Sequence, residues 1–195
     1  MLSAQKSKHL NISSNTDCTM IESMFHIPLV RLKVTNWNEK KNNLLYLYDK
    51  ILPNIELNDK IFTNFDQNKF QLIKDIEFIF QEEIQQFSRE LSLNHYFVLN
   101  AWFELACKNS YHTIHNHGGL GYSSVCFIKF NSKHHTPTKF ISPFLNFLTG
   151  ETIYYYPNNI EEGSIIFFPS SINHYTDPNI SDEERLIISF NLNVK

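Results

Sequence analysis

The sequence predicts an α+β fold, in which one strand and several helices precede a β-rich half that closes into a barrel or jelly roll. The most regular apolar run at helical spacing ends near residue 91. From residue 96 onward, short β-rich runs alternate with Asn, Pro, Gly and Ser. Helices followed by about seven or eight strands are typical of an α+β protein. In α/β proteins with parallel sheets, helices and strands instead alternate along the chain.

Composition and charge favour a single globular unit. The 195 residues are 42% hydrophobic and include 17 Phe, enough to bury a large core. A formal net charge of −3 gives no cationic field for phosphate backbones, so we expect no nucleic-acid partner. Three scattered cysteines argue against a disulfide scaffold. The sequence shows no signal peptide or apolar span, so we expect a cytoplasmic protein without a membrane partner.

The N-terminal half contains a tail, a strand and two helical runs. Residues 1–23 are polar and without period, which predicts a flexible tail ahead of one domain over 24–195. Residues 25–34 alternate as a half-buried strand, and Pro28 favours its start or a sheet edge. Asn38 is a candidate helix cap, with the helix ending near Leu52 before Pro53. Residues 68–91 repeat apolar side chains every three or four positions, which predicts one amphipathic helix that covers a sheet.

The C-terminal half supplies the strands. We divide the domain into an N-terminal strand-and-helix part, 24–94, and a β-rich part, 95–195. The expected strands are 96–107, 111–117, 122–130, 138–142, 152–156, 163–169 and 184–193. In the last strand, Leu186, Ile188, Phe190 and Leu192 alternate with a polar set that begins at Arg185. The apolar face suits packing beneath the helix, and the polar face suits a binding site inside the barrel.

Three histidines form a candidate metal site. Residues two apart on a strand share a face, so His115 and His117 can bind one ion while His112 points away. His174 follows the strand 163–169 and can supply a third ligand. Imidazole binds Fe, Zn, Cu or Ni, so the ligand type leaves the metal open. For an isolated His-x-His pair, ordinary hydrogen-bonded strand residues are the commoner reading.

The polar face of the last strand favours a metal site over ordinary hydrogen-bonded strand histidines. Arg185 offers a planar fork of donors that matches a carboxylate, and Ser189 and Asn191 share its face. A metal beside such a clamp indicates a chelating carboxylic acid as co-substrate.

Four ordered motifs then resemble the iron(II)- and 2-oxoglutarate-dependent oxygenases, in particular the branch found in marine bacteria and phages. The resemblance covers roughly residues 100–193. The motifs are NAWFELACKNSYHTIHNHGG, SSVCF, EGSIIFFPSSINHY and ERLIISFNL. The resemblance implies a double-stranded β-helix, a cupin-like jelly roll, with N-terminal helices buttressing one sheet.

The resemblance also implies roles for individual residues. His115 and His174 look like ligands of Fe(II), and Arg185 looks like the partner of the distal carboxylate of 2-oxoglutarate. His117 stands where most of the superfamily has Asp or Glu, which suggests a three-histidine site, with a two-histidine site as the alternative. Glu104 stands where Asn is frequent. Ser124 replaces a usual Gly and, with Ser189 and Asn191, is a candidate contact of the co-substrate; the facing of its strand stays open.

The implied function is an oxygenase that uses Fe(II), 2-oxoglutarate and O2. Oxidative decarboxylation of 2-oxoglutarate would be coupled to hydroxylation of an unknown protein or small molecule, in the host cytoplasm if a phage encodes the chain. Two other functions remain open at this stage. One is a three-histidine, cupin-like metalloenzyme that needs no 2-oxoglutarate, and the other is a catalytically silent jelly-roll binding module.

Overall fold

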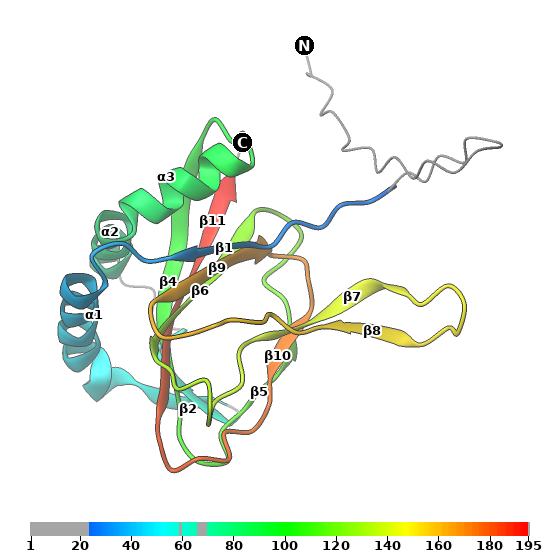
Figure 1. Ribbon diagram of the computed structural model, residues 1–195. Coiled ribbons are helices and arrows are strands. Elements are labelled where there is room, and N and C mark those ends of the chain that lie inside the picture. The colour runs from blue at the N-terminus through cyan, green and yellow to red at the C-terminus, as the bar shows by residue number, and fades with distance from the viewer. Residues whose placement is uncertain (1–23, 59, 66–69, 195) are drawn as a thin grey trace.

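The computed structural model describes residues 24–58, 60–65 and 70–194, so the expected tail over 1–23 lies outside the described residues. Two antiparallel sheets and a layer of helices make up this part of the chain (Figure 1). The larger sheet has the strand order β1-β9-β6-β11-β4-β3-β2, and the smaller has the order β5-β10-β7-β8. The jelly-roll prediction is confirmed.

The larger sheet contains the longest strands. Its members are β1 (Val30–Lys33), β2 (Glu56–Asn58), β3 (Ile61–Thr63), β4 (Tyr96–Ala106), β6 (Tyr122–Lys129), β9 (Ser164–Pro169) and β11 (Arg185–Val194). β11 lies at the centre between β4 and β6, and the predicted edge position of β1 is confirmed. The smaller sheet consists of β5 (His112–His115), β7 (Lys139–Leu145), β8 (Thr152–Tyr155) and β10 (His174–Thr176).

Three α-helices lie along one side of the larger sheet (Figure 1). α1 (Trp37–Ile51) runs into a 3-10 turn, η1 (Leu52–Asn54), close to the predicted end. The single helix predicted over 68–91 is wrong, because the described part of this run forms α2 (Phe70–Ile79) and α3 (Gln81–Glu90). The break falls at Phe80, whose ring stacks on Phe190 of β11 with centroids 5.6 Å apart. Apolar spacing continues through the break, so the pattern alone cannot reveal it.

The described residues form two hydrophobic cores. The larger core lies between the helices and the sheet and includes Leu186, Ile188, Phe190 and Leu192 from β11. The smaller core lies between the two sheets and includes Ile187 from the opposite face of the same strand. The predicted alternation of β11 is therefore confirmed, and its second face is turned into the jelly roll.

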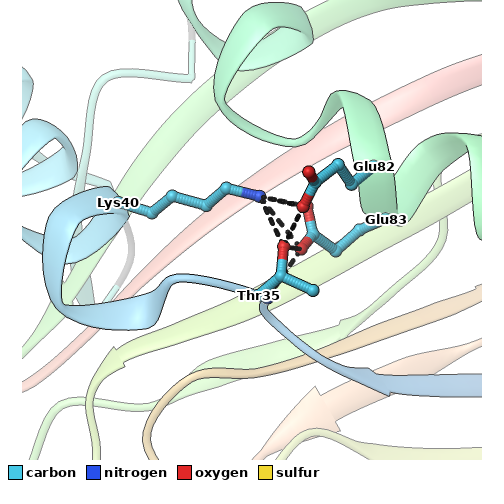
Figure 2. Close-up of polar contacts among 4 residues, drawn as sticks. All are labelled: Thr35, Lys40, Glu82 and Glu83. Carbon is cyan, nitrogen blue, oxygen red and sulfur yellow. Dashed lines mark hydrogen bonds and ion pairs between the residues drawn. The ribbon is translucent and has the colours of Figure 1, made fainter.

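A cluster of polar contacts joins the start of α1 to α3 (Figure 2). Lys40 forms an ion pair with Glu83 of α3, with Nζ 2.9 Å from Oε2, and the Glu83 side chain is almost fully buried. The backbone amide of Thr35 donates to the same carboxylate at 2.8 Å. These contacts hold the β1–α1 connection against α3. In the described part of the chain, no helix is both long and apolar enough to cross a membrane.

Candidate metal centre

Three histidines meet between the two sheets. The nearest ring nitrogens of His115, His117 and His174 all lie within 4.8 Å of one another. His115 ends β5 and pairs directly with His174 at the start of β10. His117 follows β5, and its backbone amide donates to the carbonyl of Ser170 at 2.9 Å. The structure thus brings together the three residues that the sequence selects.

Two of these rings are held in a single orientation. Nδ1 of His115 lies 2.8 Å from the carbonyl oxygen of Thr113, and Nδ1 of His174 lies 2.9 Å from that of Ile172. A carbonyl only accepts, so both Nδ1 atoms carry the proton. Nε2 of each ring keeps its lone pair, as a histidine metal ligand requires.

All three imidazoles are electrically neutral near pH 7. Burial lowers the pKa of His174 to about 3 and that of His117 to about 4. Burial lowers the pKa of His115 as well, and the nearby His112 adds to the shift. A neutral imidazole has the lone pair that a metal needs, so the cluster does not have to lose protons to bind a cation.

His112 also lies at this cluster, and the prediction that it points away is wrong. Its ring stacks on His115 with centroids 3.9 Å apart. The pairing of β5 with β10 carries an irregularity between His174 and Thr176, where the two-residue step on β10 faces a three-residue step on β5. Such a bulge breaks the strict alternation of side chains and turns His112 to the same side as His115.

A buried carboxylate borders the histidines. Glu104 of β4 is 4% exposed, and its Oε1 accepts from the indole nitrogen of Trp102 at 2.8 Å. Its Oε2 lies 3.3 Å from Nδ1 of His112. Burial opposes ionisation, but His112, the Trp102 hydrogen bond and Arg185 outweigh it and lower the pKa of Glu104 to about 2. The site therefore contains a fixed negative charge at neutral pH.

Arg185 is buried with unused hydrogen-bond donors. It is 3% exposed, and its Nε and Nη2 have no partner among the described residues. Burial lowers its pKa to about 10, so it stays charged near pH 7. Its guanidinium carbon lies 5.7 Å from the ring centroid of Phe127, on the inner face of β6. A buried cation with free donors is built to receive an anion.

A cavity of about 250 Å³ opens at the histidines. Trp102, Glu104, His112, His115 and His117 line its inner wall. The outer wall is contributed by the hairpin of β2 and β3 and by the residues after it, namely Ile61, Thr63 and Phe65. The sequence analysis did not predict this hairpin, because each of its strands has only three residues.

The other predicted contacts of the co-substrate lie on two different faces of the larger sheet. Ser189 of β11 is buried on the inner face and pairs in register with Trp102. Asn191 also faces inward, but its Oδ1 accepts from Ser123 Oγ at 2.7 Å. Ser124 pairs in register with Phe190, whose side chain belongs to the core beneath the helices. The prediction of Ser124 as a site residue is therefore corrected, since its side chain lies on the far face of β6.

The sequence analysis assigned Glu104 no role in the site and predicted that the His112 side chain points away from it. A signal for Glu104 was present, because a single acidic residue interrupts the apolar run NAWFELA of a central strand. Buried carboxylates are rare unless they are paired. For His112 no local signal exists, since the bulge depends on pairing with β10.

The comparisons agree with this geometry. Residues 100–191 match a family model described as "Putative 2OG-Fe(II) oxygenase". A comparison with curated proteins finds no match.

Solved structures share the fold at low identity. The α-ketoglutarate-dependent epimerase SnoN from nogalamycin biosynthesis is 11% identical over 84% of this chain and 76% of its own, with a TM-score of 0.66. The collagen prolyl hydroxylase of Paramecium Bursaria Chlorella virus-1, solved with 2OG, is 13% identical over 86% and 96%, with a TM-score of 0.56. A prolyl-4-hydroxylase of Pseudomonas putida is 14% identical over 86% and 92%, with a TM-score of 0.54.

Proposed function

Because the chain belongs to the 2OG-Fe(II) oxygenase family, whose members use iron(II), 2-oxoglutarate and O2, we propose that His115, His117 and His174 hold the iron. We propose further that Arg185 binds the distal carboxylate of 2-oxoglutarate and that the enzyme oxidises a protein or small-molecule substrate. The observation that carries the proposal is the convergence of three neutral imidazoles, together with a buried arginine on β11 whose Nε and Nη2 have no partner among the described residues.

The histidine cluster fits a ferrous ion. Imidazole nitrogens suit iron, and three ligands on one side of the ion leave positions open for a co-substrate and O2. His115 and His174 have their Nε2 atoms available, because Nδ1 of each is committed to a carbonyl. The third position is occupied by His117 in place of a carboxylate. Three neutral ligands would leave the full ionic charge to be balanced by the bound co-substrate, which is itself an anion.

Arg185 fits the carboxylate of the co-substrate. Its Nε and Nη2 can form two parallel hydrogen bonds to one carboxylate, the geometry in which arginine binds such groups most strongly. Burial of the guanidinium removes competing water and strengthens the pair. Ser189 lies on the same inner face of β11 and is proposed as part of the co-substrate pocket.

The chemistry that the bound iron and co-substrate supply is the oxidative decarboxylation of 2-oxoglutarate to succinate and CO2, with the second oxygen atom of O2 inserted into a substrate C–H bond. The residues of this chain bind, orient and exclude water. Trp102 packs against His117 with ring centroids 5.2 Å apart and limits the movement of that ligand. Phe65 packs against the indole of Trp102 at 4.9 Å and extends the apolar wall toward the cavity mouth.

Anaerobic titration of the Fe(II)-loaded protein with 2-oxoglutarate tests the proposal. Chelation of iron by the 2-oxo acid produces a weak charge-transfer absorption in the visible range, and we expect this band in the wild type. Arg185→Ala should shift the titration to much higher 2-oxoglutarate concentrations while iron binding is retained. Lys33→Ala, which removes an exposed cation of β1, serves as the control.

Each alternative makes a different prediction for this titration. A three-histidine metalloenzyme without 2-oxoglutarate would bind iron, give no band and keep its metal-dependent activity in Arg185→Ala. A silent binding module would give neither the band nor succinate. Either result would contradict the proposed function.

A further inference from the structure

The co-substrate side of the site contains an acidic residue that the proposed function does not use. Glu104 is 4% exposed and lies on the inner face of β4, where it lines the same cavity as His115 and His117. Its two oxygens are directed to Trp102 and His112, at 2.8 and 3.3 Å, and not to Arg185. The carboxylate is therefore held in place independently of the arginine.

Glu104 and Arg185 are nevertheless neighbours on the paired strands. Ile187 faces Glu104 across β11 and β4, and Arg185 faces Ala106, so the two charged side chains lie two residues apart on the same face. Arg185 adds to the lowering of the Glu104 pKa, and Glu104 partly offsets the lowering of the Arg185 pKa by burial. The negative charge of Glu104 therefore opposes the attraction that Arg185 exerts on an anion.

We propose that Glu104 is a specificity-determining residue that weakens the preference of this site for 2-oxo acids with a distal carboxylate, by opposing the charge of Arg185. The inference rests on the proposed function, since it takes Arg185 as the carboxylate anchor. A 2-oxo acid without the distal carboxylate loses the Arg185 pair and also avoids repulsion by Glu104. The loss of the Arg185 pair and the relief from Glu104 repulsion partly cancel. The site therefore discriminates less between the two ligands than a site with Arg185 and no Glu104 would.

The position of Glu104 makes the effect substantial. Charge–charge interactions inside a protein are several times stronger than in water, because the surroundings respond less. The contacts of Glu104 with Trp102 and His112 hold the carboxylate in its ionised form. Removal of that charge should therefore strengthen 2-oxoglutarate binding by about tenfold or more, since a tenfold change corresponds to only ~1.4 kcal/mol.

The test compares two ligands on two proteins. The Fe(II)-loaded wild type and Glu104→Gln are titrated anaerobically with 2-oxoglutarate and with 2-oxopentanoate, which has a methyl group in place of the distal carboxylate. The glutamine side chain keeps an oxygen for the Trp102 indole, removes the charge and places an amide NH2 where Oε2 faces His112. Glu184→Gln is the matched control, because it removes an exposed carboxylate next to Arg185 that pairs with Lys129.

We expect the wild type to prefer 2-oxoglutarate over 2-oxopentanoate by less than about tenfold, and Glu104→Gln to widen this ratio by about tenfold. Glu184→Gln should leave the ratio unchanged. An equal or smaller ratio in Glu104→Gln, or a large preference already in the wild type, would overturn the inference. The wild-type ratio stands even if the variant does not fold.

Failure of the inference and failure of the proposed function give different results. If the wild type binds 2-oxoglutarate and Arg185→Ala does not, the function holds, and the ligand ratio alone decides the role of Glu104. If wild type and Glu104→Gln both give no band with either ligand, the proposed function fails and the role of Glu104 fails with it.

Discussion

His115 and His174 face each other across the paired strands β5 and β10, with ring centroids 4.2 Å apart, and each directs Nδ1 to the carbonyl two residues before it. This shared local arrangement fixes both rings from their own backbone. The two Nε2 atoms are left for a common ligand, without help from a carboxylate in the outer layer. Removal of either ring should therefore remove the metal rather than relocate it.

Replacement of His174 by Ala should lower iron affinity by more than about 100-fold, since changes in the outer partners of metal ligands alone typically cost ~10–100-fold. Isothermal titration with Fe(II) under anaerobic conditions measures the change. His95→Ala removes an exposed histidine that lies outside the cluster and serves as the control. Unchanged affinity in His174→Ala would contradict the assignment of this ligand.

The segment that holds His117 depends on a buried hydrogen-bond network. Ser123 donates to Asn191 at 2.7 Å and lies 3.0 Å from Ser170, whose carbonyl accepts from the His117 amide. Asn191→Ala should loosen this segment and weaken iron binding by about 10-fold, at the lower end of the effect of outer-layer changes. The same titration measures it, with Asn193→Ala on the same strand as control. Equal affinity in both variants would show that the network does not position His117.

The ion pair of Figure 2 should matter for stability but not for the metal centre. Glu83→Ala leaves Lys40 without its buried partner, and removal of one member of a buried pair typically costs ~3–5 kcal/mol. Urea denaturation gives the free energy of unfolding. The neighbouring Glu82 is exposed, so Glu82→Ala should cost much less than Glu83→Ala. Similar losses in the two variants would contradict this account.

Acid should destabilise the fold partly through Glu104. Its folded-state pKa of about 2 lies below its ordinary value of 4.5, so the carboxylate stabilises the protein above pH 4.5. That contribution is lost as the pH falls from 4.5 toward 2. The difference in unfolding free energy between wild type and Glu104→Gln should therefore shrink by about 1 kcal/mol from pH 5.5 to 3.5. Urea denaturation at the two pH values measures it, and a constant difference would contradict the shift.

Periodicity predicted an element correctly where the two faces of that element meet different surroundings. The alternation of β11 identified both the strand and the side that carries Arg185, because the two faces meet different cores. It failed where pairing with a distant strand changes the local pattern. β3 and β10 have only three residues each, too few to show a period, and the Phe80 break lies within an unbroken apolar repeat.

Local chemistry was sufficient to select His115, His117, His174 and Arg185 as candidates, because their residue types and spacing suit a metal site and a carboxylate clamp. Their convergence, the inward turn of His112 and the neighbourhood of Glu104 and Arg185 arise from strand register. Register is set by pairing between segments about 60 to 100 residues apart, such as β5 with β10 and β4 with β11. The sequence around one charge does not say which other charges it will meet, and for that reason the polarity of the pocket is decided by the tertiary structure.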